Sequence, residues 1–359
     1  MKTPYLTIDL DKIEHNTRTI VGLCREYGIH VTGVTKATCG HPDVARAMLR
    51  GGVISIADSR LENIQRLKTA GLDAIFMLLR LPALSTVEEV VSMVDVSLNS
   101  ELTTLEALSG AARRQGKVHD VILMVDLGDL REGVWQNDIT AFVQQALKLR
   151  GIRIAGLGAN LACFGGVMPS VDNMKQLVGY ASKIENGFGV ELEWLSAINS
   201  SGLELIAAGE VPEKINHARI GEAILLGRET IHRKPWPGTF QDAFVLNAEI
   251  IELKKKPSVP VGERGEDAFG DLPNFEDRGE GLRALLNIGR EDVDIEGIIP
   301  LDTRIIILGA SSGYLVVDVT DAENDFHLGD ELAFSMNYSA LLAAMTSGYV
   351  NKQAIKSGG

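Results

Sequence analysis

Hydrophobic and polar positions repeat one pattern along the first two thirds of the chain. A short run rich in Val, Ile, Leu and Ala is followed by a polar residue or glycine, and then by an amphipathic stretch of about 10 to 18 residues. The eight apolar runs are HVTGVTK (30–36), VISIADS (53–59), DAIFMLL (73–79), DVSLNS (95–100), DVILMVDL (120–127), IAGLGANL (154–161), LEWLSAINS (192–200) and HARIG (217–221). Eight alternating strand and helix units are typical of a (β/α)8 TIM-like barrel, so the pattern predicts an α/β protein with that fold.

The stretches between these runs have helical spacing. In residues 101–116, for example, Leu102, Leu105 and Leu108 recur at intervals of three before Gly116 ends the segment. A further helix is predicted ahead of the first run, where it would cap or flank the barrel. Its apolar face carries Ile13, Ile20, Leu23 and Cys24.

The pattern changes in residues 234–238, where two prolines and a glycine interrupt it. Strand-like runs follow at 243–253, 283–289, 303–319 and 330–336, and a helix-like segment spans residues 338–348. We therefore predict a barrel domain of residues 1–233 and a C-terminal, mostly β domain of residues 234–359. Residues 5–10 alternate like a strand but precede the barrel count, which makes them a candidate strand of the β domain.

Charge and cysteine content narrow the class of partner. The formal net charge of −13 would repel nucleic acid and anionic membranes, so a small molecule is the expected partner. The three cysteines are an odd and sparse set, which fits a reducing compartment better than a disulfide framework. The N-terminus has no apolar signal region and no run of about 18 apolar residues occurs, so we expect a cytoplasmic protein. No metal site is predicted.

The chemistry is expected at the C-terminal ends of the barrel strands. Lys36 ends the first run, between apolar neighbours that would partly desolvate it and favour the reactive amine. A surface lysine is the simpler alternative. Loops 199–202 and 219–222 follow the last two runs, and their serine hydroxyls and glycine N–H groups suit a phosphate, although helix capping also explains the serines. Together these features leave two classes open, a pyridoxal-phosphate (PLP) enzyme and a lysine aldolase acting on a phosphorylated sugar.

Ordered motifs along nearly the whole chain resemble the alanine racemase family of PLP-dependent enzymes, closest to its ornithine racemase branch. These motifs include YLTIDLDKIEHN, VTKATCGH, IADSRLENIQ, VILMVDLGDLREG, INSSG, RIGEAILLGRET and LGASSGYLVVDV. The resemblance implies a homodimer arranged head to tail, with active sites shared between the barrel of one subunit and the β domain of the other. It also implies an amino-acid racemase that removes and returns the α-proton of an external aldimine.

The resemblance assigns roles to particular residues. Lys36 would hold PLP as a Schiff base and move the proton on one face, while Arg219 would meet the pyridine nitrogen. Arg131 would organise the substrate carboxylate, unless it forms an ordinary ion pair with Asp126 or Asp129. The other expected cofactor ligands are Asn160, Ser200, Ser201, Gly221, Glu222 and Tyr349, and Ser311 and Ser312 are expected to contact substrate. Tyr349 also reads as an amphipathic tyrosine on a terminal helix.

The chain departs from the family at several supporting positions. Met124 stands where alanine racemases carry a carbamylated lysine, Gly40 where they carry a tyrosine, and Asn160 where a histidine stacks on the cofactor. Arg290 stands where the tyrosine that serves the opposite face would fall. The sequence therefore does not identify the residue that acts as the second acid or base. Its candidates are Asp292, which we favour, then Asp294, Ser311, Ser312, Tyr314, Cys39 and Cys163, with solvated carboxylates and small buried thiols as the alternatives.

An acidic segment bears on the substrate. Residues 262–281 carry seven acids against two arginines, a surplus that would attract a cationic amino acid, although a hydrated loop explains it as well. With the resemblance, it favours ornithine and then lysine. Racemisation of alanine or serine and decarboxylation of an amino acid are alternative activities. A non-catalytic PLP-binding homeostasis protein is a further alternative, but such proteins lack a β domain.

Overall fold

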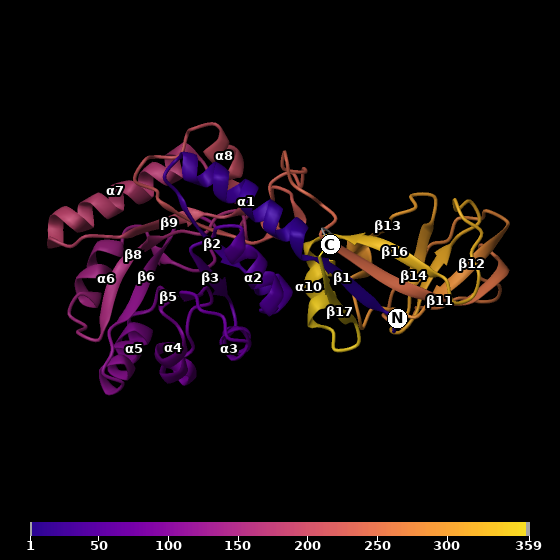
Figure 1. Cartoon of the computed structure of the whole chain (residues 1–359), viewed down its shortest axis with the longest axis horizontal. Coiled ribbons are helices and arrows are strands. Elements are labelled where there is room, and N and C mark those ends of the chain that lie inside the picture. The colour runs from indigo at the N-terminus through magenta and orange to yellow at the C-terminus, as the bar shows by residue number, and fades with distance from the viewer. Residues whose placement is uncertain (1, 357–359) are drawn as a thin grey trace. The chain divides into compact units, whose positions relative to one another are not determined.

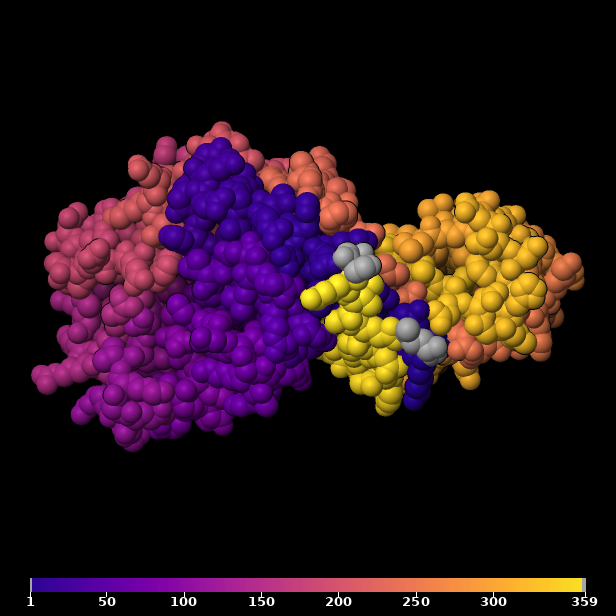
Figure 2. All heavy atoms as spheres, in the orientation of Figure 1, coloured from indigo at the N-terminus to yellow at the C-terminus, as the bar shows by residue number. Residues whose placement is uncertain are grey.

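The computed structural model describes residues 2–356, which form two compact units (Figure 1). One unit is Leu10–Gln241, and the other combines the residues up to Asp9 with Asp242–Lys356. The N-terminal segment and the last third of the chain therefore fold together, and Figure 2 shows indigo atoms of that segment among the yellow and orange atoms of the β unit.

Eight parallel strands close into a barrel in the first unit. They are β2 (His30–Val34), β3 (Ser55–Asp58), β4 (Phe76–Leu78), β5 (Val96–Asn99), β6 (His119–Asp126), β8 (Ile152–Gly158), β9 (Trp194–Ile198) and β10 (His217–Ile220). Pairing of β10 with β2 and of β5 with β6 completes the ring, and the short strand β7 (Val134–Trp135) adds to the edge of β6. Each barrel strand lies within or close to a run that the sequence predicted, because strands buried on both faces read as continuous apolar segments.

Helices alternate with these strands along the chain. They are α1 (Leu10–Glu26), α2 (Pro42–Arg50), α3 (Leu61–Thr69), α4 (Val87–Met93), α5 (Leu102–Arg114), α6 (Ile139–Ala146), α7 (Val171–Phe188), α8 (Leu203–Ala207) and α9 (Glu222–Leu226), with short 3-10 turns η1 (Lys36–Thr38), η2 (Leu84–Thr86) and η3 (Ser200–Gly202). In the opening helix, Ile13, Ile20 and Cys24 are fully buried as expected, whereas Leu23 is only half-buried. None of the helices among residues 2–356 is both long and apolar enough to cross a membrane.

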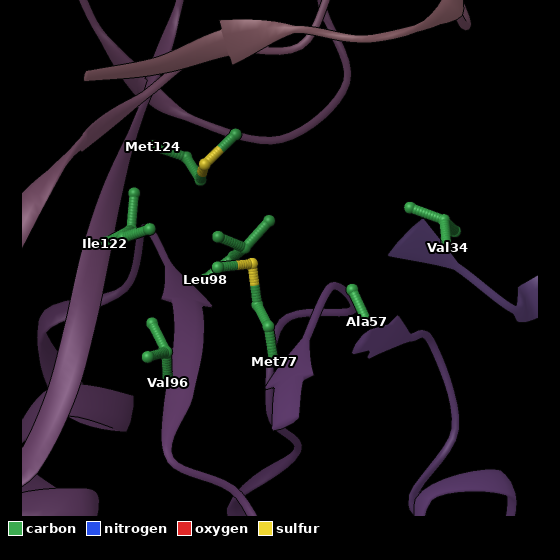
Figure 3. Packing of buried hydrophobic residues seen from close by; sticks show 7 residues of the cluster. All are labelled: Val34, Ala57, Met77, Val96, Leu98, Ile122 and Met124. Carbon is green, nitrogen blue, oxygen red and sulfur yellow. The ribbon is translucent and has the colours of Figure 1, made fainter. Parts of the chain in front are cut away.

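Apolar side chains fill the part of the barrel interior shown in Figure 3. They come from β2 to β6 and are Val34, Ala57, Met77, Val96, Leu98, Ile122 and Met124, all of which are buried. Because strand side chains alternate between faces, residues two positions away from these, such as Thr32 and Ser55, also point inward. The interior therefore has polar as well as apolar positions.

The second unit is an antiparallel sheet with one parallel pair. Its strands are β1 (Tyr5–Asp9), β11 (Phe244–Pro257), β12 (Glu280–Leu286), β13 (Ile298–Pro300), β14 (Ile306–Ala310), β15 (Leu315–Asp318), β16 (Glu331–Met336) and β17 (Asn351–Ile355), with the turn η4 (Ile295–Gly297) and the helix α10 (Tyr338–Thr346). The order is β13-β16-β11-β12-β15-β14, and β1 pairs antiparallel with β11 and parallel with β17. The single run predicted at 303–319 is a hairpin, because Ser311 and Tyr314 bond across a turn at Gly313.

The segment between the units packs on the barrel unit, so the β unit begins at Asp242, later than the expected boundary at residue 234. Asn16 of α1 donates to the Phe240 carbonyl at 2.8 Å and accepts the Phe240 N–H at 2.7 Å. Gln241 donates to the Gly227 carbonyl at 3.0 Å. These bonds, which join positions far apart in the chain, fix residues that the proline and glycine pattern alone assigned to the β domain.

Candidate active site

The residues expected to hold a cofactor lie at the C-terminal rim of the barrel, except Tyr349, which belongs to the β unit. Parallel strands place their C-terminal ends on one edge, so Lys36 after β2, Asn160 after β8 and Ser200 after β9 share that rim with Arg219 of β10. Direct pairing of β10 with β2, with Arg219 opposite Thr32, sets Arg219 beside the strand that leads to Lys36.

Lys36 begins the 3-10 turn η1 and its side chain is half-buried. The turn is anchored by Thr35, whose hydroxyl donates to Asp58 at 2.8 Å. Asp58 also accepts from the Asn63 amide at 2.9 Å and from the Arg60 N–H at 3.0 Å. Burial raises the pKa of Asp58, and these hydrogen bonds oppose that rise. The sequence analysis did not single out Asp58, although an acid at the end of the apolar run ISIAD was a signal for it.

Arg219 is buried, with 5% of its surface exposed, and the acceptors of its hydrogen bonds are neutral. Its guanidinium donates to the Ser196 carbonyl at 2.7 Å, to the Ala159 carbonyl at 2.8 Å and to the Ser196 hydroxyl. Burial lowers the pKa of Arg219 to about 10, so it is still a cation at neutral pH. Two of the five N–H groups of an arginine are left without an acceptor in the described part of the chain.

The two loops expected to form the phosphate cradle are joined to each other. Ser200, which is 6% exposed, accepts the Ala223 N–H through its hydroxyl at 3.1 Å, and this bond connects η3 to α9. Ser201 donates through its N–H to the Asn199 side chain at 2.8 Å. A Cβ on Gly221 would lie 3.1 Å from the Val34 carbonyl oxygen, so this glycine lets the loop approach the end of β2. The neighbouring Glu222 forms an ion pair with Arg233.

Arg131 has a different partner from those that the sequence suggested. It forms a two-pronged ion pair with Glu132, and it also contacts the Cys163 thiol. Burial disfavours the charge, but the hydrogen bond and charge of Glu132 outweigh it and raise the pKa of Arg131. Glu132 in turn accepts from the Asn160 amide at 2.8 Å, which links the loops after β6 and β8.

The expected acidic partners of Arg131 are used within the loops. Asp126 accepts the N–H groups of Gly128 at 2.8 Å and Leu130 at 3.2 Å. Asp129 accepts the N–H of Phe164 at 2.8 Å, among other backbone groups in that loop. Burial favours the neutral form of Asp129, but these backbone bonds prevail and lower its pKa. Sequence reasoning missed Glu132 because nothing in the spacing distinguishes it from its acidic neighbours.

Most of the candidates in the β unit fall in two adjacent loops, and Tyr349 lies outside them, after α10. The Arg290 N–H bonds the Ser311 carbonyl at 3.0 Å, and the Glu291 N–H bonds the Ser312 carbonyl at 3.0 Å. Asp292 is 6% exposed and accepts the Gly289 N–H at 3.0 Å, so it is not a solvated carboxylate. Asp294 and Ser311 are half-buried, and Ser312, Tyr314 and Tyr349 are exposed.

The two cysteine candidates lie on the barrel unit. Cys163 is exposed rather than a buried thiol, and Cys39 is half-buried with a left-handed backbone at φ 51°. Only Cys24, in α1, is fully buried.

Comparison with known proteins decides the family. The profile of the alanine racemase N-terminal domain matches residues 8–229. An ornithine racemase of Acetoanaerobium sticklandii is 44% identical over 353 residues, covering 98% of this chain and 99% of that protein. The chain belongs to the alanine racemase family. A lysine racemase of Thermotoga maritima is 40% identical over 352 residues and covers 98% of both chains.

Solved structures give the same fold. An alanine racemase from Bartonella henselae, solved with covalently bound pyridoxal phosphate, superimposes with a TM-score of 0.76 at 18% identity, over 99% of this chain and 100% of that one. The resemblance and the barrel with an added β domain, both predicted from sequence, are confirmed. Where the resemblance places a carbamylated lysine, this family member has Met124, fully buried in the apolar cluster of Figure 3.

Proposed function

We propose that this protein interconverts the L and D forms of a basic amino acid, ornithine in preference to lysine. The observation that carries the proposal is near-full-length similarity to an ornithine racemase and a lysine racemase. The chain is a PLP-dependent amino-acid racemase. The acidic segment 262–281, with its surplus of negative charge, supports a cationic substrate.

The residues of the barrel rim fit PLP. A nearly buried guanidinium with N–H groups left over suits a ring nitrogen that accepts a hydrogen bond, and Arg219 has both properties. The hydroxyls of Ser200 and Ser201, with the backbone of Gly221 and Glu222, suit a phosphate. Asn160 and Tyr349 are further proposed ligands. When bound, PLP supplies an electron sink that acidifies the substrate α-carbon.

Lys36 is the proposed acid and base on one face. Its amine Nζ would hold the cofactor in the resting enzyme, and then take the α-proton and return it. The buried Thr35 and Asp58 fix the turn that carries this amine. Arg131, oriented by Glu132, would orient the substrate carboxylate, and Ser311 and Ser312 are proposed to contact the substrate.

The second face needs its own proton donor. Asp292, the candidate favoured from sequence, binds a backbone N–H of its own loop, whereas the neighbouring Tyr314 side chain is 51% exposed. We propose to compare Asp292→Asn with Tyr314→Phe by following α-proton exchange from each enantiomer separately. Loss of the group on the second face should abolish racemisation while exchange persists from one enantiomer only, because Lys36 still serves its face. Equal exchange from both enantiomers would remove that residue as a candidate.

The test of substrate and reaction is incubation of candidate L-amino acids with the holoenzyme in deuterated water. We expect α-deuterated D-ornithine, with a slower reaction of lysine. Faster reaction of alanine or serine would overturn the proposal that the substrate is a basic amino acid. Release of carbon dioxide would indicate a decarboxylase. PLP binding without exchange from any amino acid would indicate a non-catalytic PLP-binding protein.

Replacement of Lys36 tests the site itself. Lys36→Ala should remove the visible absorbance that the covalently held cofactor gives, and racemisation should fall to background because no amine serves that face. Absorbance spectra and polarimetry measure the two effects. Lys234→Ala, in the segment after the barrel, is the matched control and should keep both. Persistence of the absorbance in Lys36→Ala would mean that another lysine holds the cofactor.

We also propose that the protein is a cytoplasmic homodimer arranged head to tail. Apolar side chains stand exposed on the two joined loops after β6 and β8: Leu130 at 64%, Phe164 at 75% and Met168 at 55%. Such a group of exposed apolar side chains is typical of a surface that another chain covers. The sparse cysteines, which include no disulfide among the described residues, agree with a reducing compartment.

A further inference from the structure

A chain of hydrogen bonds crosses four neighbouring strands inside the barrel and ends at Arg219. His217 of β10 lies at its centre, with Nδ1 2.7 Å from the Ser196 hydroxyl and Nε2 2.7 Å from the Thr32 hydroxyl. Thr32 continues to the Ser55 hydroxyl at 2.5 Å, and Arg219 donates to the Ser196 hydroxyl at the other end. All five side chains are buried, so water does not compete for these bonds.

We assign the direction of the bonds in this chain from Arg219, because a guanidinium can only donate and a serine hydroxyl that accepts from it has one proton to give. The Ser196 oxygen accepts from Arg219, so its own proton is available for Nδ1 of His217. The imidazole then carries its proton on Nε2 and donates it to Thr32, which donates to Ser55. Each bond dipole turns its negative end toward the guanidinium, so the chain stabilises the cation through neutral groups.

His217 is suited to this role only as a neutral ring. Burial lowers its pKa to about 3, and the charges of Arg219 and His30 lower it in the same direction. The indole of Trp194 packs against the ring, with centroids 4.9 Å apart, and helps to fix its plane. Protonation would make both ring nitrogens donors, and the Ser196 hydroxyl would then face a donor on either side.

The hydrogen-bond acceptors of the Arg219 guanidinium are all neutral groups. Within residues 2–356 it forms no ion pair, and its acceptors are two carbonyls and a hydroxyl. A carboxylate at this position would cancel the charge that the guanidinium presents to the rim. Neutral acceptors hold the group in place, and Glu132, the carboxylate whose charge acts on Arg219, is itself paired with Arg131.

We propose that His217 is a positioning residue that, through Ser196, holds the Arg219 guanidinium, whose hydrogen-bond acceptors are all neutral, in place facing the ring nitrogen of PLP. This inference rests on the proposed function, since it assigns Arg219 to that nitrogen. In this inference His217 touches neither substrate nor cofactor and acts through Ser196 and Arg219.

The experiment uses holoenzyme variants at both links of the chain and a matched control. Ser196→Ala and His217→Leu break the chain, whereas His217→Asn keeps an amide oxygen where Nδ1 accepted. His119→Leu is the control, because His119 is also a buried barrel histidine, 3% exposed, whose ring bonds a serine hydroxyl (Ser97, 2.8 Å). The hydrogen bonds that join His119, Ser97 and Asn99 do not include Arg219.

Three readouts separate positioning from packing. In Ser196→Ala and His217→Leu, the pH titration of the cofactor absorbance should move by about one unit and PLP affinity should fall on the order of tenfold, the size expected for a hydrogen bond to a charged group. His217→Asn should recover most of both effects. His119→Leu should lower stability and leave the titration in place. The ¹⁵N spectrum of histidine-labelled holoenzyme should show His217 neutral, with the proton on Nε2.

Two results would overturn the inference. One is a titration shift in His217→Leu no larger than in His119→Leu, which would make His217 a packing residue only. The other is a ¹⁵N spectrum with the His217 proton on Nδ1, which reverses the chain. Both results can be read without turnover, so they are distinct from a failure of racemisation, which would concern the proposed function. If His217→Leu does not fold, the smaller changes Ser196→Ala and His217→Asn still give the comparison.

Discussion

Asp58 is the single residue on which the Lys36 turn most depends. Its carboxylate is fully buried and accepts from the Thr35 hydroxyl, the Asn63 amide and a backbone N–H. Burial raises the pKa of Asp58, which shows that burial is costly for the charge, and the hydrogen bonds from its donors act in the opposite direction. The carboxyl group is therefore kept for its geometry as a triple acceptor.

We predict that Asp58→Ala lowers the free energy of unfolding by about 1–3 kcal/mol, because it leaves buried donors without an acceptor. Asp58→Asn keeps one acceptor oxygen and should lose less. Urea unfolding of both variants measures the difference. Cofactor absorbance should weaken in the alanine variant, since the turn that carries Lys36 loses its anchor. Unchanged absorbance and stability in Asp58→Ala would show that Thr35 holds the turn without it.

At the scale of elements, the turn between β2 and α2 has a backbone that few residues tolerate. Cys39 and Gly40 both have left-handed conformations, with φ of 51° and 61°. A Cβ on Gly40 would lie 2.8 Å from the Cβ and the carbonyl oxygen of Asn63. Gly40, where the resemblance places an aromatic residue, therefore lets η1 pack against the start of α3.

We predict that Gly40→Ala costs more than about 2 kcal/mol of stability, from the left-handed strain plus the collision with Asn63. Gly71→Ala is the matched control, because Gly71 also has a left-handed φ of 74° but a Cβ there would meet nothing within 4 Å. Only the strain, about 1 kcal/mol, should appear in the control. Thermal unfolding of both variants tests this, and equal losses would mean that the contact with Asn63 relaxes freely.

At the scale of the whole molecule, two buried histidines make stability depend on pH. Burial lowers the pKa of His119 to about 4 and that of His217 to about 3. Their unfolded pKa is about 6.5, so between that value and the folded pKa the unfolded chain binds protons that the folded barrel does not. The stability is therefore complete above about pH 6.5 and falls as the pH decreases. Asp58, with its raised pKa, acts in the opposite direction.

We predict a loss of about 2 kcal/mol for each histidine between about pH 7.5 and pH 5, measured as the free energy of unfolding in urea. His119→Asn removes one titrating ring and keeps a donor for Ser97. The acid-induced loss should be about 2 kcal/mol smaller in this variant. The same loss of stability in His119→Asn and in the unmodified protein would contradict the assignment of this loss to the lowered pKa of His119.

The proposed dimer is a second prediction at this scale. Phe164→Glu places a charge on the most exposed aromatic ring of the joined loops, so it should convert dimer to monomer and reduce racemisation at least tenfold. Light scattering measures the mass. Ile75→Glu, at an exposed apolar position before β4, is the control and should remain dimeric. A fully active monomer would refute the shared active site.

The sequence by itself determined the strands and helices of the barrel and the polar residues at the C-terminal ends of its strands. Strand and helix periods, set by backbone geometry, are local properties, so the apolar runs indicated the eight barrel strands and Lys36 at the end of the first. Strands β13 and β17 were not predicted, because they are short or polar and pair only with strands distant in the chain. Parallel strand ends share one edge, so the polar residues that follow them were expected to meet.

Only the tertiary structure decided which polar groups pair. Arg131 has three acids within its loop, and the path of the chain gives it Glu132 because the other two accept backbone N–H groups. The contact between His217 and Thr32 joins residues 185 positions apart. Hydrogen bonds depend on direction and on atoms a few ångströms apart, and the spacing of residue types along the chain does not carry that information.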